Sequence, residues 1–323
     1  MKKVEKFLQG WMLPLAIVTG ISLYLVYHFF PVLREAGPVL HQVTAEGQRA
    51  VIALLLFFQF VKISPHQVKL HRWFLWLLLL QVVSFLGFSA LTAFLPEGPG
   101  RILAECAMLC FICPTASAAG VITEKLGGDL AATVSYLVLI NVAATFLIPT
   151  VIPLIRPSAE IGFWLYVWKI ACKVFPVLIL PCLLAWTIRY TTHRLQRILM
   201  RLSRYTFYIW GVGLTLAMVL STRSLLLSHL GWGAVTAIVV VSMASCALQF
   251  AAGRFLGRPD DAITAGQTLG QKNTGFLIWL GYTYLTPVTS VAGGLYAIWQ
   301  NLFNSWELYK TASKSEPREK LPV

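Results

Sequence analysis

Polar and charged side chains inside long apolar segments are the residues of this chain that could do chemistry. Lys272 is the most informative of them, because a charge at membrane depth is energetically expensive and by default marks function. It lies in the run 266–275, and residues 114–117 form a second run of small, polar and helix-breaking residues. An unwound backbone at that depth is tolerated only inside protein or beside a water-filled cavity. The two runs therefore predict a buried site.

The composition predicts an all-α polytopic membrane protein. Of the 323 residues, 57% are hydrophobic and only 12% are charged, whereas a soluble domain carries about 25% charged residues. A membrane span needs roughly 20 apolar residues. The chain divides into ten such segments, approximately 11–30, 38–61, 73–95, 102–123, 130–154, 162–188, 205–221, 231–253, 262–283 and 286–307. Ten transmembrane helices leave no room for a soluble domain.

The basic residues predict how the chain is oriented. The formal net charge is +13, and its Lys and Arg residues lie between the apolar segments, where we expect cytoplasmic loops rather than a nucleic-acid site. The excess of Lys and Arg residues lies in alternate loops, including the basic loop 189–204, and in both termini. These features predict a multi-pass protein of the inner (plasma) membrane with both termini cytoplasmic. The six cysteines fall in apolar segments and are expected to be buried thiols without disulfides.

The two interrupted segments are the fourth members of two five-segment halves. Interrupted helices in corresponding positions are the best sequence indication of a transporter's binding site. Because each half has an odd number of segments, the second half would enter the membrane from the opposite side. This arrangement predicts two inverted five-helix repeats.

At these segments the chain resembles the bile acid:sodium symporter family, as a divergent bacterial-type member. The matching positions are Thr115-Ala116-Ser117 in segment four, Gly270, Asn273, Thr274 and Gly275 in segment nine, Trp299-Gln300-Asn301 in segment ten, and Gln81 in segment three. The resemblance implies that helices 4 and 9 are unwound and cross each other. It also implies a panel domain (11–61 and 160–225), a core domain (68–154 and 231–307) and a cytoplasmic tail (308–323).

The resemblance further implies secondary active transport of a small organic anion by alternating access, commonly coupled to sodium. Segment nine departs from the family pattern, with Thr268 in place of the family's Glu and Lys272 in place of its Gln. We expect the Lys272 ammonium to replace a sodium ion, either as a fixed cation or by carrying a proton. Alternatively, Lys272 snorkels to the surface or binds a backbone carbonyl. A sodium symporter with a reduced site, or a non-transporting membrane sensor, stays open as an alternative function.

The candidate site residues are polar side chains near the expected crossover or in segment six. The expected substrate-binding residues are Thr115, Ser117, Asn273, Gln300, Asn301 and Lys173. The expected coupling-ion or crossover residues are Lys272, Gln81, Thr268, Gln271 and Thr133. Sodium or a proton is the possible coupling ion, and no cofactor is expected.

Other charged residues near segment ends have local explanations. Glu46 is expected to pair with Arg49, and Glu105 with Arg101, which lies one helical turn earlier. Metal-ligand spacing and a Ser/His/Asp arrangement at one depth are both missing from the sequence, so we expect neither a metal site nor an enzyme. The expected partners are the lipid bilayer and the organic anion, and the chain could be monomeric or homo-oligomeric.

Overall fold

The protein is all-helical, as the composition predicts. In this computed structural model the described residues are 2–228, 230–257 and 259–315. Within them, the β-type pairing consists of one isolated bridge, between Thr115 and Lys272. Arg258, which belongs to a predicted basic loop, and residues 316–323 of the predicted tail lie outside the described part of the chain.

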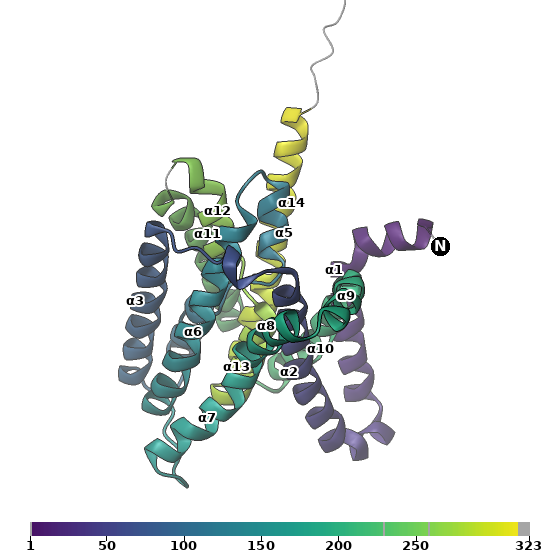
Figure 1. The fold of residues 1–323 in the computed structure, drawn as a ribbon. Helices are drawn as coiled ribbons and strands as arrows, with labels where there is room; N and C mark the ends of the chain where they lie inside the picture. Colours follow the sequence, from purple (N-terminus) through teal and green to yellow (C-terminus); the bar gives the residue numbers. More distant parts are fainter. Residues whose placement is uncertain (1, 229, 258, 316–323) are drawn as a thin grey trace, which may run out of the picture.

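The described residues contain fourteen α-helices and five short 3₁₀-helices, joined by turns and loops (Figure 1). The α-helices are α1 (Lys2–Phe29), α2 (Gly37–Lys62), α3 (Arg72–Phe94), α4 (Pro99–Ile112), α5 (Ala119–Lys125), α6 (Leu130–Ile155), α7 (Phe163–Leu178), α8 (Leu180–Thr191), α9 (His193–Leu202), α10 (Thr206–Leu227), α11 (Trp232–Leu256), α12 (Ala262–Gly270), α13 (Thr274–Tyr284) and α14 (Ser290–Ser315). The 3₁₀-helices are η1 (Pro31–Ala36), η2 (Pro65–Gln67), η3 (Ser203–Tyr205), η4 (Pro259–Asp261) and η5 (Pro287–Thr289).

Several of these helices can cross a membrane. Six helical stretches in the described chain are long and apolar enough, and the pair α7 and α8, bent by 43°, makes a seventh candidate. The six stretches are Trp11–Phe29, Gly37–Lys62, Arg72–Phe94, Leu130–Ile155, His193–Leu227 and Trp232–Leu256. Large hydrophobic side chains such as Phe94, Phe146 and Trp232 are exposed on them. The structure therefore supports a multi-pass membrane protein.

Three of the ten expected segments are not among these candidates. The fourth segment is divided into α4 and α5, and the ninth into α12 and α13, so each piece is shorter than the 18 residues of a continuous span. The tenth, α14, is long enough but carries Gln300, Asn301, Asn304 and Glu307 in its middle part. These amides and the carboxylate make α14 too polar to qualify by composition.

Residues 193–204 differ from the expected loop. The structure places helix α9 there, followed without a gap by η3 and α10. Apolar and basic residues alternate with a helical period in α9, so the average over the segment is polar although one face is apolar. The hydropathy averaged over this segment therefore does not indicate the helix that the structure shows.

The buried core surrounds the broken helices. Its main cluster joins residues of α2, α4, α6, α7, α11, α13 and α14, including Ile52, Met108, Ile148 and Phe276. The cysteines are free thiols, and five of the six are buried as predicted, whereas Cys172 on α7 is exposed. The core cluster therefore includes the end of α4, at one of the two helix breaks.

Candidate functional site

The two helix breaks lie against each other and are joined through the backbone. The amide of Ala116 donates to the carbonyl oxygen of Gln271 at 3.0 Å, and the amide of Asn273 donates to that of Pro114 at 2.8 Å. These bonds form the antiparallel bridge between Thr115 and Lys272. Breaking a helix leaves amide and carbonyl groups without partners, and each break supplies partners to the other.

Side chains reinforce this contact. Thr115 Oγ1 donates to the carbonyl oxygen of Thr268 at 2.8 Å, and the amide of Lys272 donates to Gln300 Oε1 at 2.8 Å. Asn273 caps α13, because its Oδ1 accepts from the amide of Phe276. Of the expected substrate-binding residues, Thr115, Asn273 and Gln300 therefore meet at the breaks.

Lys272 is fully buried at the centre of this contact, with 0% of its surface exposed. Its Nζ has no hydrogen-bond partner among the described residues, and the titratable groups around it are the thiols of Cys110, Cys113 and Cys246. Lys272 thus neither snorkels to the surface nor binds a backbone carbonyl. It is an amine held inside the protein.

The oxygen atoms expected to bind sodium are engaged in protein hydrogen bonds. Gln81 Oε1 accepts from Tyr136 Oη at 2.6 Å, while the Gln81 amide nitrogen donates to the carbonyl oxygen of Phe111 at 2.7 Å. Thr268 Oγ1 donates to Thr133 Oγ1 at 3.2 Å. Each of these oxygens therefore already has a protein hydrogen-bond partner, and the buried amine of Lys272 lies at the adjoining breaks.

A buried polar chain that sequence reasoning missed leads away from the breaks. Gln271 hydrogen-bonds to Gln267, whose Nε2 donates to Glu307 Oε2 at 2.5 Å. Glu307 on α14 is only 4% exposed and pairs with Arg254 of α11. Nothing in the spacing of Glu307 along the sequence relates it to residues 40 positions earlier, so only the polar character of α14 could have indicated it.

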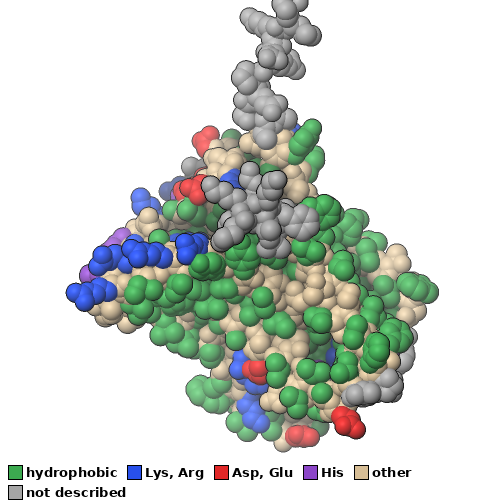
Figure 2. Space-filling view, turned by 90° about the vertical axis from the view of Figure 1, so that its right-hand side faces the viewer, with side chains coloured by type: hydrophobic (Ala, Val, Ile, Leu, Met, Phe, Trp, Pro, Cys, Tyr) green, Lys and Arg blue, Asp and Glu red, His purple; other side chains and the backbone are tan. Residues whose placement is uncertain are grey.

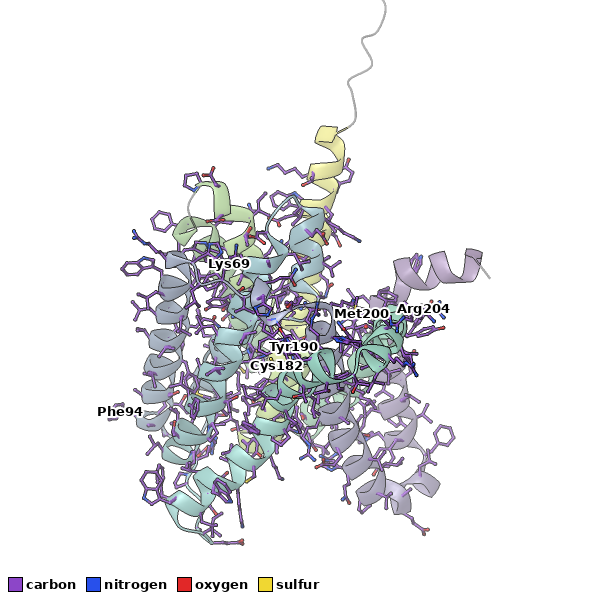
Figure 3. The ribbon with its side chains drawn as sticks, in the orientation of Figure 1. Lys69, Phe94, Cys182, Tyr190, Met200 and Arg204 are labelled. Atoms are coloured by element: carbon purple, nitrogen blue, oxygen red, sulfur yellow. The ribbon has the colours of Figure 1, made fainter. Side chains whose placement is uncertain are left out.

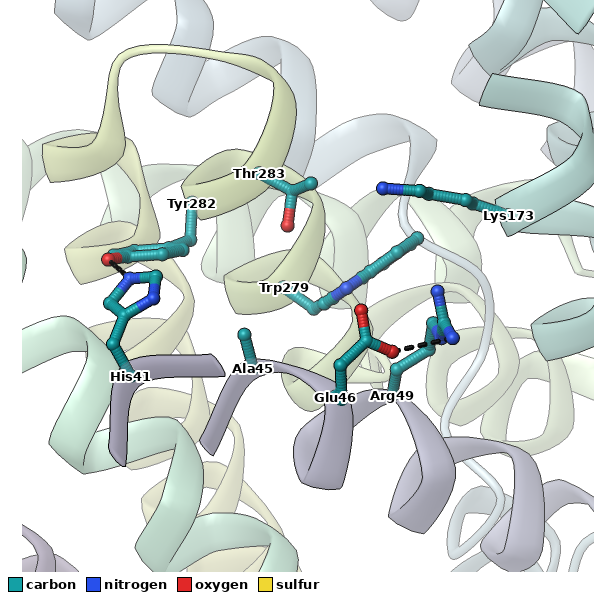
Figure 4. A pocket seen from close by; sticks show the side chains of 8 residues that line it. All are labelled: His41, Ala45, Glu46, Arg49, Lys173, Trp279, Tyr282 and Thr283. Atoms are coloured by element: carbon teal, nitrogen blue, oxygen red, sulfur yellow. Dashed lines mark hydrogen bonds and ion pairs between the residues drawn. The ribbon is translucent and has the colours of Figure 1, made fainter. Parts of the chain in front are cut away.

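A separate pocket of about 270 Å³ opens between α2, α7 and α13 (Figure 4). Its lining residues are His41, Ala45, Glu46, Arg49, Lys173, Trp279, Tyr282 and Thr283. Lys173 extends from α7 toward Thr283 in Figure 4. Arg49 and Glu46 form the expected ion pair, at 2.5 Å. The pocket thus combines two cationic side chains with an aromatic wall.

One hydroxyl in this pocket is bound from two sides. Tyr282 Oη makes hydrogen bonds with His41 of α2 and with Arg223 of α10. His41 and Tyr282 were not predicted as site residues, because they are far apart in the sequence and have no motif. The bonds connect the C-terminal end of α13 to two neighbouring helices.

Three predicted site residues do not join the contact between the breaks. Lys173 lies in the pocket between α2, α7 and α13, and Asn301 donates to the carbonyl oxygen of Ala297 in its own helix. Ser117 is half-buried in the turn before α5. These residues therefore do not form one site with Thr115.

Glu105 was expected to have a local partner but is bound mainly by a distant one. It is 0% exposed and lies 3.8 Å from Arg101, as expected, but 2.7 Å from Arg156, which follows α6. The amide of Thr286 also donates to Glu105, at 3.1 Å. The carboxylate thus holds together the ends of α4, α6 and α13. Neither a family model nor a curated protein matches this chain, so the geometry of these residues carries the functional interpretation.

Proposed function

We propose that the chain is a secondary active transporter that moves a small organic anion across the inner membrane by alternating access. The observation that carries this proposal is the paired break, in which Thr115 and Lys272 are bridged and Lys272 is completely buried. Unwound backbone is costly in a membrane unless it lines a water-filled cavity or is buried in protein. Two such breaks in corresponding segments are typical of a transport site.

The proposed architecture has ten spans in two inverted repeats. In it, α4 with α5 forms span four, α12 with α13 forms span nine, and α14 forms span ten. The polar groups of these three spans are buried inside the protein, as Thr115, Thr268 and Glu307 are, so they need not face lipid. The resemblance to the bile acid:sodium symporter family belongs to this proposal, as do cytoplasmic termini.

The pocket supports an anionic substrate. Lys173 brings positive charge to it, because Arg49 is paired with Glu46, and Trp279 offers an apolar surface. In the proposed architecture α2 and α7 belong to the panel domain and α13 to the core domain, so the pocket lies between the two parts that would move. Its volume of about 270 Å³ suits a small carboxylate rather than a large one.

The buried ammonium supports transport without the usual sodium sites. In this proposal Lys272 supplies a positive charge beside the breaks, while Gln81 and Thr133, the sodium ligands that remain, bind protein groups and Thr268 replaces the family's Glu. A sodium ion placed there would be repelled by the ammonium. Lys272 therefore takes the role of a coupling cation in this proposal.

The experiment is uptake of radiolabelled small carboxylates into proteoliposomes that contain the full chain. We expect saturable uptake that is unchanged when external sodium is replaced by N-methylglucamine. Lys272→Ala should abolish it, and Lys272→Arg, which keeps a charge of different shape, should retain a part. Strict dependence on sodium would contradict the role of Lys272, while specific binding without flux for every carboxylate would favour a sensor.

A further inference from the structure

Helix α9 has the residue pattern of a helix that lies on a membrane surface. Arg194, Arg197 and Arg201 recur at intervals of three and four residues, so they share one face. Leu195, Ile198 and Leu202 recur in the same way on another face. A helix with a strongly basic face and an apolar face typically lies in the plane of the membrane interface.

The structure leaves both faces uncovered. Leu195, Ile198 and Leu202 are 39%, 52% and 42% exposed, and the three arginines are exposed as well. A third face holds the helix to the protein, since Leu199 packs against the main core cluster and Ser203, directly after α9, is buried. The helix is therefore attached to the protein, and its apolar residues are exposed all the same.

Within the stretch His193–Leu227, α10 alone has 22 residues, which is enough to cross the membrane and leaves α9 for an interfacial position. In Figure 3 the labelled residues Tyr190, Met200 and Arg204 follow one another across the molecule, whereas α2 and α3 run along it. Figure 2 shows basic side chains gathered on one flank, directly beside hydrophobic ones.

No carboxylate of the neighbouring sequence can neutralise these arginines. The chain has no Asp or Glu between Glu160 and Asp260. Within the described residues, Arg194, Arg197 and Arg201 take part in no ion pair. Arg204, which follows in η3, lies over the ring of Tyr205 at 4.7 Å. Among the described side chains, no carboxylate supplies the negative charge that would match this face.

We propose that α9 is a binding site for anionic phospholipids of the membrane that holds the protein. Arg194, Arg197 and Arg201 bind the headgroup phosphates, while Leu195, Ile198 and Leu202 contact the upper part of the acyl chains. Both contacts are made by one lipid surface, which a soluble anion could not provide. The site is independent of the proposed transport function, because none of its residues lines the pocket or the breaks.

The test is native mass spectrometry of the full chain in neutral detergent, titrated with dioleoylphosphatidylglycerol or dioleoylphosphatidylcholine. We expect tighter binding of the anionic lipid. Each basic residue near an anionic surface contributes about fivefold in affinity, so the triple variant R194Q/R197Q/R201Q should lose on the order of a hundredfold. The triple lysine variant R194K/R197K/R201K keeps the charge and should retain most of the binding.

The matched control removes three other basic residues that share the predicted cytoplasmic side, in the variant K62Q/K69Q/R72Q. It should stay within about fivefold of the unmodified chain, the contribution of one such residue. Equal affinity for the two lipids, an equal loss in the control variant, or displacement of the lipid by millimolar inorganic phosphate would each overturn the proposal. The arginines are exposed and form no ion pair with a carboxylate in the described part of the chain, so the glutamine variant should remain folded.

Discussion

The backbones of Thr115 and Lys272 pair with each other although 157 positions separate them, and they join two helices at the points where both are broken. The pairing makes each break the hydrogen-bond partner of the other. Since an unpaired peptide group costs several kcal/mol in a bilayer, neither break would be stable alone. Any movement at this point therefore has to carry both breaks together.

The hydroxyl of Thr115 should contribute measurably to stability. Thr115→Val removes its bond to the carbonyl oxygen of Thr268, which is buried. Leaving a buried acceptor without its donor costs about 1–3 kcal/mol. The free energy of unfolding in mixed micelles should fall by that amount. Thr150→Val is the matched control, because Thr150 is exposed and bonds only to its own helix; equal losses would contradict the role of Thr115.

Glu105 should be the most important carboxylate at the ends of α4 and α6. Glu105→Gln removes the buried one of the two carboxylates that lie 2.7 Å from Arg156, and breaking a buried ion pair costs about 3–5 kcal/mol. Glu97→Gln removes another partner of Arg156, but the Glu97 side chain is 67% exposed, so about 0–1 kcal/mol is expected. Thermal unfolding of both variants in detergent measures the difference. Similar midpoints would show that burial of Glu105 does not matter.

Gly270 should tolerate no side chain. A Cβ at this position would fall on the ring of Phe250, and such overpacking typically costs about 1–3 kcal/mol. Gly270→Ala should therefore lower the unfolding free energy, and adding Phe250→Leu should restore part of it. Gly87→Ala is the control, since a Cβ there meets no described atom within 4 Å. A neutral Gly270→Ala would mean that α12 and α11 are packed less closely.

Lys173 should help to bind the substrate of the proposed transporter. Lys173→Gln removes one positive charge from the pocket. An ion pair in contact with water contributes about 1 kcal/mol, so KM for a small carboxylate should rise roughly fivefold while the maximal rate changes less. Lys169→Gln, one helical turn earlier and exposed outside the pocket, is the matched control. A rise in KM of the same size for both variants would remove Lys173 from the site.

Much of the fold could be predicted because hydropathy is a local property. The long apolar runs became α2, α3, α6 and α11. The interruptions were also visible, since Pro114 lacks an amide hydrogen and Gly270 weakens a helix. The helix α9 was missed for the converse reason, because averaging its two faces makes the segment polar.

The partners of the polar residues could not be predicted. Glu105 was assigned to Arg101 by its position one helical turn away, whereas the closer partner is Arg156, 51 residues further along the chain. The contact of His41 with Tyr282 spans 241 positions. Such pairs depend on how helices pack in three dimensions, and a single sequence contains no measure of that.

Lys272 differs from a bound ion in that it never leaves the chain. A dissolved ion drives accumulation of a solute only by being released down its own gradient, whereas a tethered ammonium returns with the protein at the end of every cycle. If the crossover carries organic anions, the work of accumulation must come from the membrane potential, from exchange against a second anion, or from the proton of Lys272. The buried side chain of a single residue would thus decide which energy source the cell can use.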